Sequence, residues 1–285
     1  LSQNLLHDNQ RPPFASVLKG GMMSQDIFVE VGHGPTLIDN NIMLSDASLR
    51  FATEGVALVH NLICGALTCV GGGTGPRYTP YHMPHRTEVM GFMTVLHGDD
   101  RFYNNIFVQK WPSDDIITMH DSDDGFDTEN RAAGTWMFDE YPTYDEWISQ
   151  FDFSKPADMA KLYGAHEGKL PVWIEGNAYL GGAKPSKKDV NALISTVARE
   201  DVRVELVQKE DGYYLDTNVY ELIEGFKNRM IDSDVLGKAF EPEERFENPD
   251  GTAIRFDSDY FGTHRGVDVI PGPFASKEEA AKKLY

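Results

Sequence analysis

The sequence has little of several features that would each indicate a class of protein. Its 285 residues contain only two cysteines, Cys64 and Cys69, which form no disulfide framework and leave no second pair for a zinc site. No run of about 20 apolar residues is present, so a transmembrane helix is not expected. Residues 1–115 show no clear 3.6-residue period, which argues against long amphipathic helices there.

Basic residues are scarce relative to acidic ones. The 26 Lys and Arg stand against 45 Asp and Glu, so the formal net charge is −19. This charge argues against nucleic acids and anionic membranes as partners, because both are polyanions, whereas a neutral glycan is compatible with it. Residues 1–6 have neither the basic region nor the apolar core of a signal peptide, so we expect a location in the cytoplasm or periplasm.

Four short segments resemble one another in sequence, and each starts an apolar run with asparagine. The separation from Asn40 to Asn61 is 21 residues, and that from Asn61 to Asn104 is 43 residues, about twice as long. A period near 20 is typical of a solenoid, in which stacked asparagines bond to one another from coil to coil. The segments are Asn4-Leu5-Leu6, Asn40-Asn41-Ile42, Asn61-Leu62-Ile63 and Asn104-Asn105-Ile106.

This repeat predicts a right-handed parallel β-helix, and strand-like runs over residues 171–260 predict a small antiparallel β-sandwich after it, so the fold class is all-β. An ordinary sandwich with Asn-rich turns is the alternative. We expect β-helix coils over residues 1–140 with a projecting loop at 71–85, a helical connector over 141–170 and the sandwich with a terminal tail over 171–285. Thr143 is the expected helix cap, and Asp211-Gly212 is a hairpin signal. Because the first strand should have a neighbour, we also expect a second chain or N-terminal half to complete the β-helix, and an oligomer.

Three glutamates on or beside apolar strands are candidate catalytic groups: Glu30, Glu54 and Glu88. A carboxylate on a stacked strand is costly unless it is used or paired. Retaining glycosidases need two carboxyl groups about 5 to 5.5 Å apart, close to the spacing of neighbouring strands. Candidates to bind sugar hydroxyls are His33, His60, Arg77, His82 and His85. We expect neither a metal nor another cofactor.

Five stretches of the chain resemble the bacterial β-xylosidases of glycoside hydrolase family 120. They are VEVGHGPTLIDNN at residues 29–41, TPYH at 79–82, GDDRFYNN at 98–105, EGNAY at 175–179 and FENPDG at 246–251. The resemblance runs along nearly all of the chain, which is similar to the C-terminal half of such an enzyme. It implies a β-helix joined to an immunoglobulin-like domain, with an Asp nucleophile and a Glu acid/base that release xylose from short xylosides.

The chain departs from this family at Phe51, where an acidic residue is expected. The resemblance therefore leaves Glu54 or Asp46 to take the role of the nucleophile. We expect a retaining glycoside hydrolase that acts on short neutral glycans and serves xylan degradation. Two alternatives stay open: a β-helix polysaccharide lyase that uses His82 and Arg77, and a carbohydrate-binding solenoid without catalysis.

Overall fold

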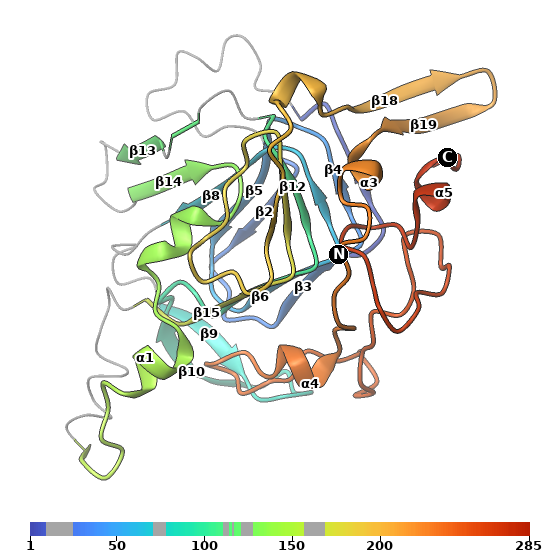
Figure 1. Ribbon diagram of the computed structural model, residues 1–285. Coiled ribbons are helices and arrows are strands. Elements are labelled where there is room, and N and C mark those ends of the chain that lie inside the picture. The colour runs from blue at the N-terminus through green and yellow to red at the C-terminus, as the bar shows by residue number, and fades with distance from the viewer. Residues whose placement is uncertain (10–24, 71–77, 111–113, 116, 121–127, 157–168) are drawn as a thin grey trace.

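The computed structural model describes residues 1–9, 25–70, 78–110, 114–115, 117–120, 128–156 and 169–285 (Figure 1). Short strands dominate these residues, and the chain returns again and again to the same three sheets. β-Branched and aromatic residues fill the strands. Residues with positive φ, among them Asn40, His60 and Asn104, turn the chain from one sheet to the next.

Two of the sheets are parallel throughout. The first has the order β15-β11-β6-β3, and the second has the order β1-β4-β7-β12-β16-β17. The strands of the first sheet are β3 (Thr36–Asp39), β6 (Val56–Val59), β11 (Asp100–Tyr103) and β15 (Val172–Glu175). Those of the second are β1 (Leu5–Leu6), β4 (Ile42–Met43), β7 (Leu62–Ile63), β12 (Ile106–Val108), β16 (Ala178–Leu180) and β17 (Leu193–Ile194).

The third sheet is mixed and has the order β13-β14-β8-β5-β2. β2 and β5 are parallel, as are β5 and β8, whereas β14 runs antiparallel to both β8 and β13. Its strands are β2 (Ile27–Glu30), β5 (Ala47–Ala52), β8 (Ala66–Val70), β13 (Ile117–His120) and β14 (Thr128–Ala132).

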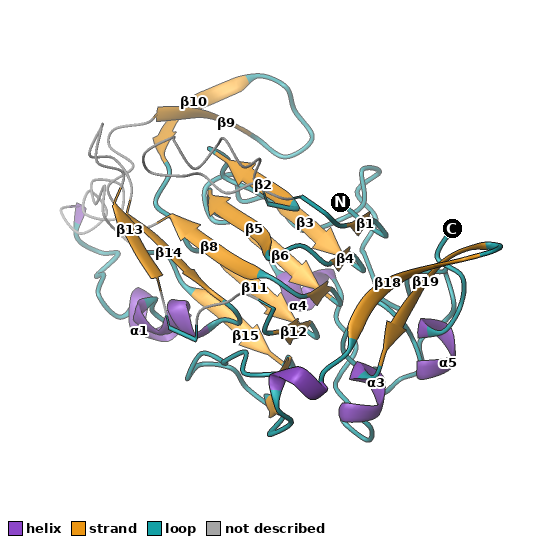
Figure 2. Cartoon of the chain, turned by 90° about the horizontal axis from the view of Figure 1, so that it is seen from above, coloured by secondary structure: helices purple, strands orange, loops and turns teal. Residues whose placement is uncertain are grey.

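Two antiparallel hairpins and several short helices lie outside the three sheets (Figure 2). The hairpins are β9 (Tyr78–His82) with β10 (Val89–Thr94), and β18 (Val204–Lys209) with β19 (Gly212–Thr217). The helices are α1 (Tyr144–Ile148), α3 (Val219–Leu222), α4 (Ser233–Leu236), α5 (Lys277–Ala280) and the 3₁₀ turns Trp136–Glu140 and Arg199–Asp201. No helix of the described residues is long and apolar enough to cross a membrane.

The main core fills the space that the three sheets surround. Phe51, Phe102 and Phe138 pack edge to face or tilted against one another, with ring centroids 4.8 to 6.1 Å apart. Phe107 stacks on Tyr179 at 5.2 Å. Aromatic pairs in these geometries add to the free energy gained from burial of their area, so this cluster fixes the distance between the sheets.

A buried ladder of asparagine side chains runs across the second sheet. Each amide Nδ2 donates to the Oδ1 of the next asparagine at 3.0 Å, and the members are Asn4, Asn41, Asn61, Asn105 and Asn177. Each Oδ1 of the last four members also accepts the backbone N–H of the preceding member at 2.9 or 3.0 Å. The predicted stacking of asparagines is therefore confirmed.

The predicted register of that stack is wrong by one residue. Asn61 aligns with Asn41 and Asn105, whereas Asn40 and Asn104 align with His60 at the positive-φ turn just before the ladder. The repeat is 20 residues long from Asn41 to Asn61, one shorter than the distance from Asn40 suggested. Because two asparagines are adjacent at 40–41 and again at 104–105, the sequence does not show which one of each pair joins the ladder.

The predicted fold class is also wrong: the described residues do not show a single right-handed β-helix followed by an immunoglobulin-like sandwich. Antiparallel β14 closes the third sheet, and two separate hairpins interrupt the parallel pattern. Within residues 169–285, all of which are described, β15, β16 and β17 join the parallel sheets, and β18–β19 forms no second layer. The sequence repeat concerned only the short turns, and turn chemistry does not determine which strands pair beyond them.

Two local predictions are confirmed. Thr143 caps α1 in a capping box, in which its hydroxyl accepts from the backbone of Glu146 and the Glu146 carboxylate accepts from the Thr143 backbone. Asp211 and Gly212 lie where β18 turns into β19. The division into residues 1–140, 141–170 and 171–285 stays a prediction. The predicted projecting loop at 71–85 lies partly outside the described residues, and β9 begins at Tyr78.

The irregular segment after α3 depends on the sheets for its polar contacts. Arg265, which is buried, donates to Asn40 Oδ1 at 2.8 Å and to the Gly272 carbonyl at 3.1 Å. Asn104 bridges the same segment, since its side chain donates to the Arg229 carbonyl and its own carbonyl accepts from Gly272. The segment therefore lies against the turns between sheets.

We predict that Asn61→Ala lowers the free energy of unfolding by at least about 2 kcal/mol, because buried groups left without a partner cost about 1–3 kcal/mol each. The substitution removes the acceptor of the Asn41 N–H and the donor to the Ile38 carbonyl. Urea denaturation measures the change. Asn4→Ala, at the half-buried end of the ladder, is the control and should cost clearly less. Equal losses would contradict a cooperative ladder.

Candidate active site

Glu54 follows β5 and lies at a point where three chain segments approach closely. Its N–H donates to the Gly32 carbonyl at 3.1 Å, and the next residue, Gly55, donates to Gly98 at 3.1 Å. Gly55 has φ of 73°, and a Cβ there would stand 2.9 Å from the His33 carbonyl and 3.3 Å from Asp99 Oδ2. Only glycine fits this left-handed turn, which brings the side chains of His33, Glu54 and Asp99 together.

The Glu54 carboxylate is fully buried and accepts two hydrogen bonds. His33 Nδ1 donates to Oε1 at 2.6 Å, and the Leu96 N–H donates to Oε2 at 2.7 Å. On its other nitrogen, the His33 ring bonds to the hydroxyl of Thr79 on β9. A buried carboxylate needs such donors, since burial of an unpaired charge costs several kcal/mol.

Glu241 is the further carboxyl group beside this pair. It lies partly buried after Phe240, and its Oε1 is buried with no hydrogen-bond partner. Burial, followed by the charge of Glu54, raises the pKa of Glu241 to about 7. A carboxyl group of this kind holds its proton near neutral pH, which is what a general acid requires.

The charges of the cluster are coupled. Burial alone would lower the pKa of His33, but the hydrogen bond and charge of Glu54 outweigh it, so this pKa is raised. Burial raises the pKa of Asp99 to about 6, against the lowering effect of Arg101. His33, Asp99 and Glu241, whose pKa values Glu54 influences, are thus all shifted from their ordinary pKa, as is common in active sites. We call these four residues the carboxylate cluster.

Asp99 and Arg101 hold in place the segment that carries Glu241. Arg101 Nη1 bonds to Asp99 Oδ1 at 2.8 Å, Nε donates to the Leu236 carbonyl at 2.8 Å and Nη2 to the Lys238 carbonyl at 2.6 Å. The second oxygen of Asp99 accepts the Phe240 N–H at 2.8 Å. The buried ion pair therefore fixes the backbone immediately before Glu241.

The remaining candidate carboxylates lie elsewhere. Glu30 is exposed at the end of β2, and Glu88 is exposed before β10, where its carbonyl accepts from His82. No direct bond joins either of them to the carboxylate cluster among the described residues. Phe51, where an acid was expected, packs in the core, and Asp46 is exposed.

Of the five candidate sugar-binding residues, only His33 joins the carboxylate cluster. His85 is half-exposed and bonds to Glu247 at 2.6 Å. His60 is fully buried between Gly272 and Asn104, and burial holds its pKa well below the ordinary value. His82 lies on β9, and Arg77 is outside the described residues.

Sequence reasoning missed Glu241 and the roles of Asp99 and Arg101. Asp99 and Arg101 stand two residues apart in a run of three charged residues, a pattern typical of a surface turn, but both are buried. Glu241 lies in an irregular acidic stretch that carries no pattern. Among the described residues, no group of three or more His, Cys, Asp or Glu is arranged to hold a metal ion.

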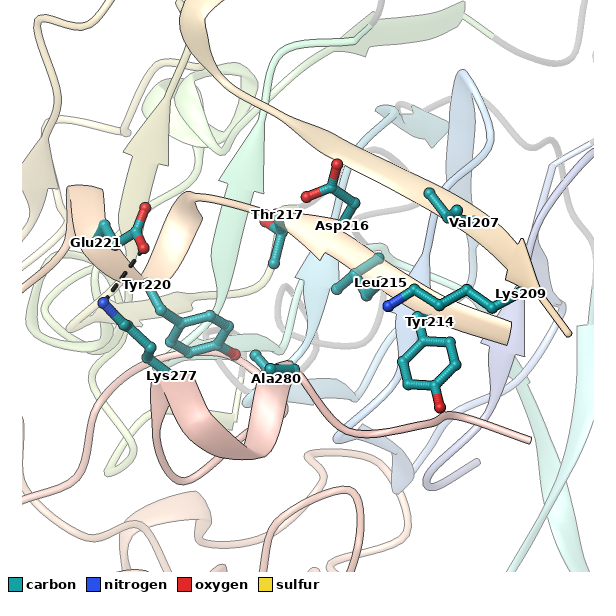
Figure 3. Close-up of a pocket in the computed structure, with 11 residues that line it drawn as sticks. Val207, Lys209, Tyr214, Leu215, Asp216, Thr217, Tyr220, Glu221, Lys277 and Ala280 are labelled. Carbon is teal, nitrogen blue, oxygen red and sulfur yellow. Dashed lines mark ion pairs between the residues drawn. The ribbon is translucent and has the colours of Figure 1, made fainter. Parts of the chain in front are cut away.

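A hollow lies between the β18–β19 hairpin and α5 (Figure 3), and its volume is about 410 Å³. Its two carboxylates are both paired with cations. Glu221 lies 3.3 Å from Lys277 across the rim, and Asp216 bonds to Arg203 at 2.8 Å. Paired surface carboxylates of this kind offer no proton donor, so we favour the carboxylate cluster as the site of chemistry.

No protein-family model matches the chain, and no curated protein matches it in sequence. Among solved structures, the fold is similar to that of XylC in its complex with xylose. The TM-score is 0.77, and the sequences are 28% identical over 100% of this chain. The chain spans only 39% of the XylC chain. Membership of glycoside hydrolase family 120 stays a prediction.

We predict that Arg101→Met lowers the free energy of unfolding by about 3–5 kcal/mol, since it leaves the buried Asp99 without its cation. Urea denaturation measures the loss. Arg245→Met is the matched control, because the Arg245–Asp234 pair is on the surface, where such pairs contribute about 0–1 kcal/mol. A small loss in both variants would show that the Asp99–Arg101 pair does not hold this segment.

Proposed function

We propose that the protein is a glycoside hydrolase that acts on xylosides. The observation that carries the proposal is the buried Glu54–His33 pair together with a carboxyl group, Glu241, whose pKa burial and the charge of Glu54 raise to about 7. Hydrolysis of a glycosidic bond needs a carboxyl group that is protonated near neutral pH, and the environment of Glu241 supplies one. The similarity to XylC, which was solved with xylose, supports a xylose-acting, glycosidase-like function.

In the proposed reaction, Glu241 donates its proton to the glycosidic oxygen as the bond to the anomeric carbon breaks. Glu54 attacks that carbon and forms a glycosyl ester. Water then cleaves the ester while Glu241 accepts the water's proton, so the anomeric configuration is retained. His33 holds Glu54 in position and balances its charge. Retention of the anomeric configuration is the most specific part of the proposal. NMR that identifies which anomer forms first tests it.

Glu54 is covered in the structure, and the proposal requires that it be reached by substrate. The groups that cover it include His33 and Thr79, and Thr79 belongs to the β9–β10 hairpin rather than to the main sheets. A small displacement of this hairpin would break the Thr79–His33 bond without disturbing the sheets. Catalytic hydrogen bonds in unliganded enzymes commonly rearrange when substrate binds.

The predicted alternatives find less support. A lyase that acts on a uronate needs a cation to neutralise the substrate carboxylate, but the carboxylate cluster is rich in acids, and Arg101 is already fully engaged. A binding module without catalysis gives no reason for a carboxyl group with a raised pKa beside a buried Glu–His pair. The predicted completing chain or N-terminal half, and an oligomer, stay predictions.

We predict that Glu54→Gln and Glu241→Gln each lower kcat/KM on xylobiose by about 10²–10⁴-fold, the usual range for loss of an acid–base group. On an aryl xyloside, whose leaving group needs little protonation, Glu241→Gln should lose much less than Glu54→Gln. Glu243→Gln, an exposed neighbour, is the control. Glu30→Gln and Glu88→Gln test the other candidates. Full activity in a Gln variant would remove that residue from the mechanism.

We predict that activity falls as pH rises through about 7, because Glu241 then loses the proton it must donate. The alkaline limb of kcat/KM should disappear in Glu241→Gln. The free energy of unfolding should also fall as pH rises. Glu241 in the folded state holds a proton that it releases near pH 4.5 in the unfolded state, so stability declines between pH 4.5 and about 7. If Glu241→Gln leaves the alkaline limb unchanged, a group other than Glu241 causes that limb.

A further inference from the structure

A separate pocket of about 260 Å³ lies against the segment that leads to Glu241. Three elements build it: α1 contributes Tyr144 and Trp147, β15 contributes Trp173, and the segment after α4 contributes Lys238 and Phe240. Its floor includes Asp99, which belongs to the carboxylate cluster. The pocket is smaller than the roughly 300 Å³ at which sites for drug-sized ligands begin, so it suits a single ring.

The walls of this pocket are aromatic and closely packed. Tyr144 and Trp173 lie nearly parallel, with ring planes 28° apart and centroids 6.4 Å apart. Trp147 meets Phe240 edge to face at 5.2 Å. Trp173 is fixed from behind by the Arg101 guanidinium, 4.4 Å from the ring centroid. Rigid aromatic walls offer apolar area to the C–H faces of a pyranose at a small cost in conformational entropy.

The polar groups of the pocket are hydrogen-bond donors without protein partners. The indole N–H groups of Trp147 and Trp173, the Tyr144 hydroxyl and the Lys238 ammonium bond to no described residue, although all four residues line the pocket. Both Asp99 oxygens are occupied, by Arg101 and by the Phe240 N–H. A ligand in this pocket would meet these donors, and the hydroxyl and ring oxygens of a neutral sugar can accept from them.

The pocket and the carboxylate cluster share a wall. Phe240 lines the pocket, and the next residue is Glu241. Asp99 links the two, since its carboxylate accepts the Phe240 N–H and its charge adds to the effects of burial and of Glu54 that raise the pKa of Glu241. A sugar ring in the pocket would thus lie beside the proton donor.

We propose that this pocket binds one pyranose ring of the glycan substrate, the ring next to the bond that Glu241 protonates. The class of ligand rests on the proposed function, whereas the pocket itself rests on its own geometry. A ring bound in the pocket would position the glycosidic oxygen against Glu241. The pocket would therefore favour substrates of at least two sugar units over substrates with a single sugar unit.

Tryptophan fluorescence measures binding without turnover, because Trp147 and Trp173 both line the pocket. We expect saturable changes when xylobiose is titrated into the Glu241→Gln protein. In the Glu241→Gln protein, the additional substitution Tyr144→Ala should raise the Kd about tenfold, because roughly one aromatic contact is lost. Tyr144→Phe keeps the ring and loses only the hydroxyl, so it should raise the Kd less than Tyr144→Ala does.

The matched control is Tyr285→Ala, because Tyr285 is 54% exposed and Tyr144 is 49% exposed, and Tyr285 lies by the β18–β19 hairpin. It should leave the Kd unchanged. Binding by Tyr144→Ala with the parent Kd, or a loss in Tyr285→Ala as large as that in Tyr144→Ala, would overturn the assignment of the pocket. So would the absence of xylobiose binding in a folded protein.

Turnover separates this inference from the proposed function. If xylobiose binds and Tyr144→Ala weakens it, but the parent protein hydrolyses no xyloside, the pocket is upheld and the hydrolase proposal fails. If the protein hydrolyses xylobiose and Tyr144→Ala changes neither KM nor kcat, the hydrolase is upheld and the pocket is overturned. With both correct, Tyr144→Ala raises KM for xylobiose while the alkaline pKa of kcat/KM stays where it was.

Discussion

A carboxylate can be buried only where the fold supplies hydrogen-bond donors for it, and Glu54 has two donors from different chain segments. The imidazole of His33 comes from the turn before β3, the N–H of Leu96 comes from the approach to β11, and Gly55 permits the close approach of both segments. Each donor is fixed by strands that pair in register. Loss of that register would leave a buried charge unpaired, so the sheets and the candidate site depend on one another.

The same requirement explains the Asp99–Arg101 pair. Arg101 is held between the rings of Trp173 and Phe246, at 4.4 and 4.8 Å, and its Nε, Nη1 and Nη2 groups donate to Asp99 and to carbonyls of the segment before Glu241. A planar guanidinium satisfies these acceptors in one fixed geometry, which lysine would not. An irregular segment thereby acquires a defined position without secondary structure of its own.

The sequence predicted those parts of the molecule that local chemistry determines. Stacked asparagines, the Thr143 cap and the Asp211-Gly212 turn each depend on a few neighbouring residues, and all three are present. The pairing of β14 with β8 and the absence of a sandwich depend on distant strands, and no local motif encodes them. Glu54 and His33 were found because they lie beside strands. Glu241 was missed because its environment comes from residues far away in the chain, and an acidic stretch usually indicates only a solvated surface.

The contacts of the segment after α3 also bear on how the molecule folds. Arg265, Arg229 and Gly272 find their partners at Asn40, Glu175 and Asn104, which lie at the ends of stacked strands. These contacts join residues more than 50 positions apart in sequence. Order in this segment therefore depends on the stacked sheets, because its partners are brought together only there. A chain in which the sheets have formed but this segment has not docked would hold His33 and Glu54 in place without Glu241, so the two proposed catalytic carboxyl groups would not yet be assembled.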